Sequence, residues 1–437
     1  RLRNITQFLG GYAYKSSKYI GESKNIVIRM GNIKNNELRP YITKTCISDE
    51  YAVETSSYAI CQNDILFTMT GTRGKRDYFY SCLVNAEDLH DANLYLNQRV
   101  GCLRIFDINR IHPSYLVTVL QSRSVLNAIF ETETGNVSQG NIGSAAPLNL
   151  LIPIPPTREQ FAIHTTVQSI LELIGTYEIA KKELHSIIGI LKAKILDLAI
   201  RGKLVPQNPT DEPASVLLER IHAEKEELIK QGKIKRDKKE SVIFKGEDNS
   251  YYDEVPKNWA VSTLNQLTHP LLLNDGDWIL SENMNTQGEV KLIQLGSVGI
   301  MRYVDKGFKY LSESTFQELN CTQIYSGYML INRIVSDKMC TCILPTIEGK
   351  IITTVDTCWV APKEEWYNLK YLMYTLSSPS FQSLVMLNSG GTTRKRISKN
   401  NLINLPFAFP PLDEQHRIVK VIEAAFTQLD AIAESLN

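Results

Sequence analysis

"PPLDEQHRIV" at residues 410–419 repeats a stretch that lies 255 residues earlier, "PPTREQFAIH" at residues 155–164. The likeness extends upstream, where "YLVTVLQSRS" from Tyr115 resembles "YLMYTLSSPS" from Tyr371. Solenoid repeats have periods of a few tens of residues, so a repeat this long indicates a duplicated domain. The pattern Pro-Pro-x-x-Glu-Gln therefore predicts that the same structural unit occurs twice.

The proline pairs predict where two helices begin. Proline holds the residue before it in extended backbone and does not fit inside a helix, so each helix is expected to start directly after its pair. Glu159 and Glu414 then fall in the first turn, where the helix dipole favours negative charge.

Both predicted helices carry apolar residues at alternating steps of four and three. This heptad pattern runs for five repeats in the first helix, interrupted only at Lys181, and it is typical of a coiled-coil seam. The two matching seams are expected to pair with each other, although the second helix has about half the length of the first. Both ends of the natural protein are expected to lie outside this sequence. The predicted seam consists of Ile163, Val167, Ile170, Ile174, Tyr177, Leu184, Ile188, Leu191 and Ile195, with Ile418, Ile422, Leu429 and Ile432.

Composition sets only broad limits. A chain of 437 residues with 43% hydrophobic content is long enough for two or three domains. Its eight cysteines include no Cys-x-x-Cys pair and its seven histidines are scattered, which favours reduced thiols in the cytoplasm and predicts no metal site. No apolar run approaches the roughly 20 residues that span a bilayer, so no membrane association is expected. The net charge of +1 does not point to nucleic acid.

The fold class expected is α+β, with two duplicated β-rich domains joined by a long coiled coil. Alternating stretches such as "IVIRMGNI" and "DILFTM" predict strands in the first domain, with a helical segment over 114–129. A further helix should follow Pro213, and the polar segment "GKIKRDKKESVIFKGEDNSYYDE" should be a tether. The predicted boundaries are 1–156 for the first β-rich domain, 157–245 for the first helical region with its linker, 246–411 for the second β-rich domain and 412–437 for the second helical region.

Several stretches together resemble the specificity subunits of type I DNA restriction-modification systems. They are the two Pro-Pro signatures, "VPKNWAVSTL" from Val255 and the tract "GKLVPQNPTDEPASVLLERI" from Gly202, which is the most specific of them. The resemblance covers nearly the whole chain and implies two target-recognition domains, each followed by a conserved helical region. It implies a subunit without catalytic residues or cofactor that reads a split, asymmetric target in double-stranded DNA. The helices would be antiparallel and would set the spacing between the two half-sites. Two methylation subunits that use S-adenosylmethionine, and in some complexes restriction subunits, would be its partners.

Four loops with glycine, hydroxyl and cationic residues are the candidates for DNA contact, because amides and guanidinium groups bind phosphates and base edges. "TMTGTRGKR" and "GNVSQGN" belong to the first domain, and "INRIVSDK" and "SGGTTRKRISKNN" are their counterparts in the second. For each loop an ordinary solvated turn is the competing interpretation. The candidate residues are Thr72, Arg73, Lys75, Arg76, Gln139, Arg333, Lys338, Thr392, Thr393, Arg394, Lys395 and Arg396.

Three other functions compete with this one. An adenine methyltransferase needs an Asp/Asn-Pro-Pro-Tyr/Phe type of motif, and the chain has only Asn208-Pro209-Thr210. A nuclease could use Asp337 with Glu348 and Lys350, but Glu348-Gly349-Lys350 is more simply a hairpin turn between "CTCILP" and "IITTVD". The remaining alternative is a coiled-coil adaptor whose β-rich modules bind other proteins.

Overall fold

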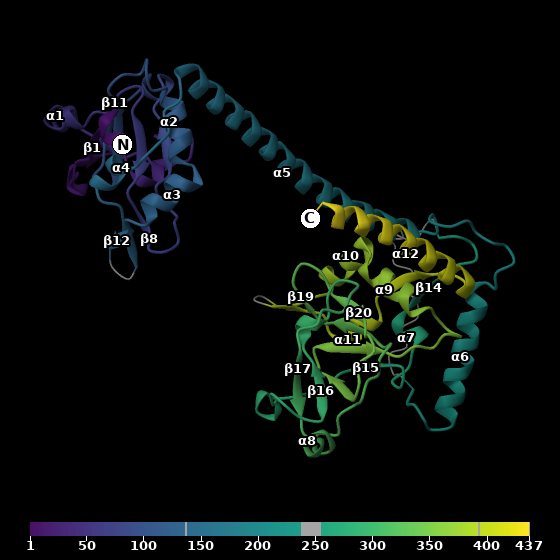
Figure 1. Ribbon diagram of the computed structural model, residues 1–437. Coiled ribbons are helices and arrows are strands. Elements are labelled where there is room, and N and C mark those ends of the chain that lie inside the picture. The colour runs from purple at the N-terminus through teal and green to yellow at the C-terminus, as the bar shows by residue number, and fades with distance from the viewer. Residues whose placement is uncertain (136–137, 237–254, 392–393, 437) are drawn as a thin grey trace. The chain divides into compact units, whose positions relative to one another are not determined.

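The computed structural model describes residues 1–135, 138–236, 255–391 and 394–436 (Figure 1). Two compact units account for the chain, unit 1 over Arg1–Ile179 and unit 2 over Ala180–Asn437. Each unit combines helices with small sheets, as the expected α+β class requires. The predicted tether lies largely at 237–254, outside the described residues.

Unit 1 is built on two four-stranded sheets. The first has the antiparallel order β1-β11-β7-β9, and the second has the order β10-β3-β6-β2, in which β10 and β3 are parallel. The strands "NIVI" and "ILFT" are buried along their whole length, because each lies inside its sheet with both faces covered. The strands are β1 (Thr6–Gly10), β2 (Tyr19–Ile20), β3 (Asn25–Ile28), β6 (Cys46–Ile47), β7 (Ile65–Thr68), β9 (Ser81–Leu83), β10 (Asn93–Leu96) and β11 (Val100–Ile105), with a small hairpin of β4 (Ile33–Lys34) and β5 (Glu37–Leu38).

The helical segment expected over 114–129 is two helices rather than one. Ser122 has extended backbone, with ψ of 146°, and stands directly before the second helix, a position that serine favours. The helices of unit 1 are α1 (Asp49–Glu54), α2 (Pro113–Leu120), α3 (Arg123–Phe130), α4 (Ala145–Asn149) and the first part of α5 (Thr157–Ile200).

Unit 2 repeats this plan. Its larger sheet has the antiparallel order β15-β22-β18-β20, and in a second sheet β16 lies parallel to β21. Its strands are β14 (Ala260–Thr263), β15 (Leu273–Asp275), β16 (Val290–Ile293), β17 (Phe308–Leu311), β18 (Met329–Asn332), β20 (Thr341–Ile343), β21 (Lys350–Thr353), β22 (Thr357–Val360) and β24 (Pro406–Phe409). Its helices are α6 (Ala214–Lys230), α7 (Leu264–Leu267), α8 (Glu313–Glu318), α9 (Leu369–Ser377), α10 (Pro379–Leu387), α11 (Lys399–Ile403) and α12 (Leu412–Ser435).

The duplication extends to single backbone contacts. Tyr12 lies two residues beyond β1 and exchanges two backbone hydrogen bonds with the segment that crosses it, through Leu96 and Gln98. Asp277 lies two residues beyond β15 and does the same with Thr353 and Val355. A glycine precedes each of them. A Cβ on Gly11 would lie 2.0 Å from a carbonyl oxygen of the crossing segment, and one on Gly276 would lie 2.3 Å from another. The duplicated domain predicted from the signature is thus present in the structure.

One local prediction is wrong. Glu348-Gly349-Lys350 does not join a hairpin, because the strands on its two sides belong to different sheets: β20 pairs with β18, and β21 pairs with β16. Lys350 forms an ion pair with Glu313 instead.

The glutamine of each signature fixes the start of a helix to its own unit. Gln160 accepts a hydrogen bond from the amide of His112, 2.8 Å away, at the start of α2, and donates to the carbonyls of Arg110 and Pro155. Gln415 accepts from the amide of Asn368, also at 2.8 Å, at the start of α9, and donates to the carbonyl of Pro410. Both glutamines are fully buried. Pro-Pro-x-x-Glu-Gln is therefore the sequence of a joint between domain and helix.

The predicted seam is buried only in part. In α5, Ile170, Ile174 and Tyr177 are half exposed and Leu191 is 44% exposed, whereas Ile188 is buried. Within the part of α5 that belongs to unit 2, Leu196 and Ala199 are the most buried residues, and Leu196 lies one position beyond Ile195 of the predicted stripe. The shift occurs because this end packs against a whole domain, which covers a wider face than one partner helix would.

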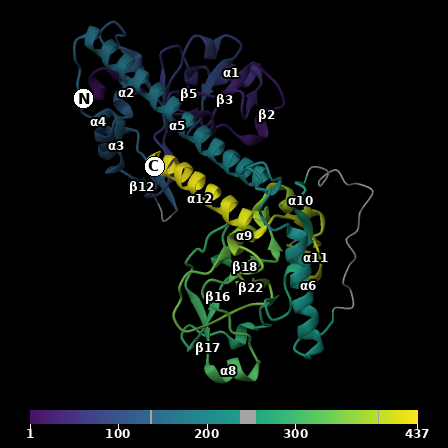
Figure 2. The same cartoon turned by 90° about the vertical axis from the view of Figure 1, so that its right-hand side faces the viewer.

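Helix α12 lies alongside the C-terminal part of α5 and runs in the opposite direction (Figures 1 and 2). Lys192 forms an ion pair with Asp430 and stands over the ring of Phe426, 5.0 Å from its centroid. Ile418 and Ile422 are fully buried, but they belong to the core of unit 2, together with residues of α9. The first half of α12 is therefore a domain helix, and a seam along the whole of α5 is not confirmed.

The tract that follows α5 packs around the start of α12. Helix α5 ends at Ile200, and Gly202 has φ of +65°, a left-handed conformation that suits glycine after a helix. Asp211 forms an ion pair with Arg417 at 2.5 Å. Glu414 is buried and accepts hydrogen bonds from Gln207 and from the indole of Trp259. Burial raises the pKa of Glu414, against the effect of these two donors.

Candidate nucleic-acid interface

The two candidate loops of unit 1 form one projecting element. Strand β8 (Thr70–Thr72) continues from β7 and pairs antiparallel with β13 (Gln139–Asn141), which also pairs with β12 (Thr134–Gly135). Figure 1 shows this small sheet reaching away from the body of unit 1. Thr72 lies directly opposite Gln139 in the pairing, so loops far apart in sequence meet at one place.

Cationic side chains are concentrated at the turn that follows β8. Arg73, Lys75 and Arg76 are exposed. Arg73 donates a hydrogen bond to the carbonyl of Gly135 across the small sheet. Arg76 donates to Asn127 of α3 and lies over the ring of Phe130, which orients its guanidinium group. The turn thus presents partly fixed cations, the kind of surface that contacts phosphates and base edges.

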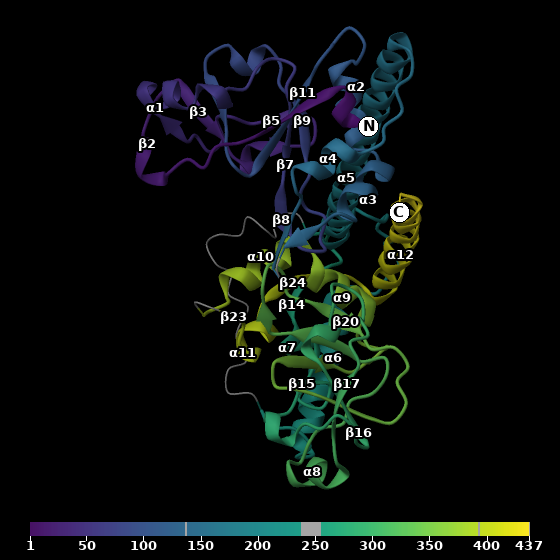
Figure 3. The same cartoon turned by 60° about the vertical axis from the view of Figure 1, so that its left-hand side comes forward.

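Unit 2 has the corresponding element. Strand β19 (Ile334–Val335) continues from β18 and pairs antiparallel with β23 (Lys395–Arg396), and Figure 3 shows β23 projecting from unit 2. Arg394 and Lys395 are exposed there. Thr392 and Thr393 lie outside the described residues. The structure therefore brings "INRIVSDK" and "SGGTTRKRISKNN" together, as it does their counterparts in unit 1.

Two of the predicted arginines have partners inside unit 2. The guanidinium of Arg333 is buried, with its Nε 3.1 Å from the carboxylate of Asp275 and with the carbonyls of Val355 and Ile397 as acceptors. Arg333 is thus a core residue, and its prediction as a DNA contact is wrong because these groups already surround its charge. Arg396 is partly exposed and forms an ion pair with Asp356 at 2.9 Å.

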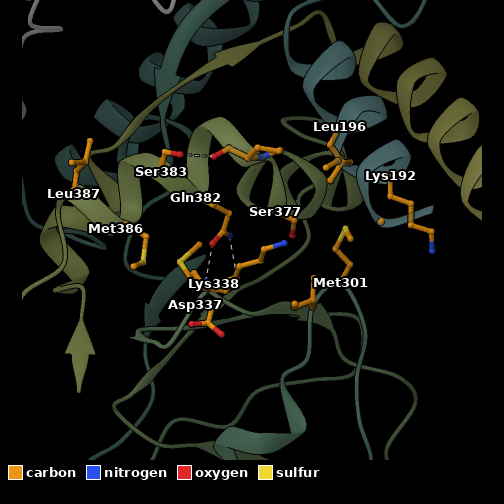
Figure 4. Close-up of a pocket in the computed structure, with 15 residues that line it drawn as sticks. Lys192, Leu196, Met301, Asp337, Lys338, Ser377, Gln382, Ser383, Met386 and Leu387 are labelled. Atoms are coloured by element: carbon orange, nitrogen blue, oxygen red, sulfur yellow. Dashed lines mark hydrogen bonds between the residues drawn. The ribbon is translucent and has the colours of Figure 1, made fainter. Parts of the chain in front are cut away.

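Lys338 lies apart from this element, at the rim of a hollow of about 660 Å³ in unit 2 (Figure 4). The hollow is bounded by α5 and α10 and by the loops that contain Met301 and Asp337. Its wall is ordered by Gln382, whose amide group exchanges two hydrogen bonds with the backbone of Met339. The wall is mainly apolar, with Leu196, Met301, Met386 and Leu387, so Lys338 borders an apolar surface rather than a cluster of cations.

Sequence analysis missed a polar hollow of about 550 Å³ in unit 1. Arg29 and Arg99 line it, together with Asn32, Asn97 and Gln98. Arg29 directly follows β3 and Arg99 directly precedes β11, so neither lies in one of the four candidate loops. Only the way the strands pair brings the two arginines together.

The described residues contain no group of three or more histidine, cysteine, aspartate or glutamate side chains that is placed to hold a metal ion. Asn208 closes its own turn, donating to Asp211 and accepting from Thr210, so Asn208-Pro209-Thr210 is structural. Across the described part of the chain, no helix has the length and apolar character needed to cross a membrane.

The family model described as type I restriction modification DNA specificity domain matches residues 1–186 and 256–437. The chain belongs to this family. Its two matched segments correspond to the two copies of the duplicated fold, each including its Pro-Pro signature and the start of the helix behind it.

The relatives are specificity subunits of Escherichia coli type I restriction enzymes. The EcoAI subunit is 33% identical over 253 residues and the EcoEI subunit 29% identical over 268; each match covers 56% of this chain and 40% of the relative. This chain therefore spans less than half the length of these two relatives. The EcoBI subunit is 19% identical over 99% of this chain and 80% of its own length.

Two solved structures share the fold along the whole chain. The HsdS subunit from Thermoanaerobacter tengcongensis is 17% identical, with a TM-score of 0.55 and 90% of its own chain covered. A chain from a study of complex assembly and conformational transition of the type I R-M system is 15% identical, with a TM-score of 0.57 and 91% covered.

Proposed function

We propose that this chain is the DNA-reading subunit of a type I restriction-modification complex and that it carries out no chemistry of its own. Unit 1 reads one half of a split, asymmetric target, and unit 2 reads the other half. The observation that carries the proposal is that both units present the same projecting strand pair, β8 with β13 and β19 with β23, each with exposed cationic side chains.

The chemistry of these elements fits duplex DNA. Arg73 and Lys75 of unit 1 and Arg394 and Lys395 of unit 2 are exposed on short strands or turns that are narrow enough to enter a groove. Their charges attract the phosphates, which supplies affinity without regard to sequence. Thr72 and Gln139 sit opposite each other and offer hydrogen-bonding groups suited to base edges.

The partners proposed are two methylation subunits that use S-adenosylmethionine to modify adenine at N6, joined in some complexes by restriction subunits. The half-exposed apolar residues of α5, Ile170, Ile174 and Tyr177, support a protein partner along this helix. An adaptor that binds only proteins would use the same face. The two functions differ in whether the projecting elements determine a DNA sequence.

We further propose that α5, together with α12, sets the unread spacer between the half-sites. Helix α5 has 44 residues, which at about 1.5 Å per residue gives it a length of roughly 66 Å. Inserting one heptad into each helix, at positions equivalent by the repeat, adds roughly 10 Å and turns the helix by only about 20° relative to two full turns. The spacer should lengthen by about three base pairs, since each pair rises about 3.4 Å. A changed half-site with an unchanged spacer would contradict the proposal that the helices set the spacer length.

Methylation mapping tests the function itself. The chain is co-expressed with its methylation subunit, and every methylated adenine is mapped in the host genome for wild type, Arg73→Ala and Arg394→Ala. A bipartite motif is expected for wild type. Arg73→Ala should reduce methylation through the first half-site and Arg394→Ala through the second, so each variant is the control for the other. The absence of a bipartite motif would refute the proposed function, and equal losses at both halves in both variants would give the two arginines a structural role.

A further inference from the structure

The polar hollow of unit 1 lies directly beside the base of the projecting element. Thr70 of β8 places its hydroxyl 2.8 Å from the sulfur of Met30, and Met30 lines the hollow. The amide of Met69, the residue before β8, donates to the carbonyl of Arg99 at 3.1 Å. The hollow therefore borders the base of the projecting strands.

Both arginines of the hollow are exposed, and within the described ranges neither guanidinium group makes an ion pair. Backbone contacts hold their positions instead. The amide of Arg29 donates to the side chain of Asn32, whose own amide group donates to the carbonyl of Arg39. Arg99 is held by its carbonyl contact with Met69. The side chains project from a fixed backbone and are available to a ligand.

The duplication shows which residues of unit 2 correspond to these arginines. Met69 accepts from Ile142 and donates to Arg99, and in the same way Arg333 accepts from Ile397 and donates to Asp356. Arg99 thus corresponds to Asp356. The strands β3 and β16 each run into a short 3-10 turn, over Met30–Asn32 and over Leu295–Ser297, so Arg29 corresponds to Gln294.

The charge at this place therefore differs between the two units. Unit 1 has two cations. Unit 2 has a neutral glutamine, whose amide donates to the carbonyls of Lys306 and Gly307, and an aspartate that forms an ion pair with Arg396. A duplicated scaffold that, among the described residues, carries unpaired cations in one copy and no unpaired charge in the other indicates a position that selects between ligands rather than one that maintains the fold.

We propose that Arg29 and Arg99 read bases of the first half-site, in addition to the projecting loop, and that they require at least one guanine there. The proposal rests on the DNA-reading function proposed above. Arginine binds the O6 and N7 atoms of guanine with two hydrogen bonds, a pairing that glutamine and aspartate do not reproduce. Unit 2, which lacks both cations, then reads a different base at the corresponding place, and this makes the target asymmetric.

Methylation mapping of the complex tests this with single variants. Arg29→Lys keeps the charge but loses the planar two-donor geometry, Arg29→Gln places the unit 2 residue in unit 1, and Arg99→Ala removes the second cation. Each should relax the preference at one position of the first half-site by roughly tenfold or more, with the second half-site unchanged. Arg110→Ala is the matched control, because this exposed arginine of unit 1 lies outside the hollow.

The outcomes separate this inference from the proposed function. A wild-type complex without a bipartite motif refutes the proposed function itself. A wild-type motif that all three variants retain unchanged overturns only the role of the hollow. A loss that is uniform over all sequences overturns it as well, because contacts to phosphate alone weaken binding without changing the preference. If one of the other variants proves less stable in thermal unfolding, the base preference of Arg29→Lys, the least disruptive substitution, decides whether the hollow reads bases.

Discussion

Replacing Gln160 with alanine should loosen the joint between unit 1 and α5. Three hydrogen bonds are lost, one from the amide of His112 and two to the carbonyls of Arg110 and Pro155, at 2.8, 2.9 and 2.9 Å. A typical intramolecular hydrogen bond contributes about 1 kcal/mol net, and a buried group left unpaired costs about 1–3 kcal/mol. Because the site is fully buried, the variant should lose roughly 3 kcal/mol of local stability.

The assay is hydrogen exchange of the full-length chain, followed by mass spectrometry of peptides that contain the start of α2. Since about 1.4 kcal/mol corresponds to a factor of ten, the amide of His112 should exchange roughly 100-fold faster in the variant. Gln415→Ala should act on the start of α9 in the same way but less strongly, because Gln415 makes fewer of these bonds. Arg158→Ala, an exposed change in the same helical turn, is the control and should leave exchange within about 0.5 kcal/mol of wild type. An equally small effect of Gln160→Ala would refute the reasoning.

Three other substitutions probe unit 2. Gly276→Ala should destabilise unit 2 strongly in urea unfolding, because the new Cβ would lie 2.3 Å from a carbonyl oxygen. Gly21→Ala is the control and should not destabilise the chain, because nothing lies within 4 Å of its Cβ. Equal effects of the two substitutions would contradict the close backbone approach at Gly276. Arg333→Ala should cost roughly 1–3 kcal/mol, because it leaves the partly buried carboxylate of Asp275 without its cation; a stable variant with an altered DNA motif would return Arg333 to the interface. His269 has a pKa lowered by burial and then by Lys225, so the unfolded chain binds a proton that the folded chain does not. Stability should therefore fall as pH drops below about 6.5, and His269→Gln should flatten this part of the pH profile while the exposed His222→Gln should not. A steeper loss of stability at acid pH in His269→Gln than in wild type would contradict the lowered pKa of His269.

The sequence was most informative where a repeated motif has a local mechanical role. The starts of α5 and α12, the stop at Gly202 and the helix after Pro213 all follow from proline and glycine backbone preferences, and the structure confirms them. The glycine, hydroxyl and cationic residues of the projecting loops also mark them as candidates, but the sequence did not predict that the two loops of each unit pair with each other.

Long-range contacts limited the remaining predictions. The heptad pattern predicted one partner helix for α5, but Leu196 and Ala199 are buried by a domain whose position no periodicity reveals. Arg333 resembled an interface residue because its loop is polar, and only the pairing of β15 with β22 brings Asp275 to it. Arg29 and Arg99, 70 residues apart, were missed because strand order alone makes them neighbours.

The glutamine joint has a consequence for how new specificities arise. Gln160 and Gln415 bind their units almost entirely through backbone carbonyls and amides, groups that every sequence supplies. A foreign reading module with the same loop path could therefore be spliced ahead of either helix without redesigning the connection. If each unit reads one half of the target, as proposed, recombination at the Pro-Pro signatures would exchange that half and leave the other unit and the helices unchanged.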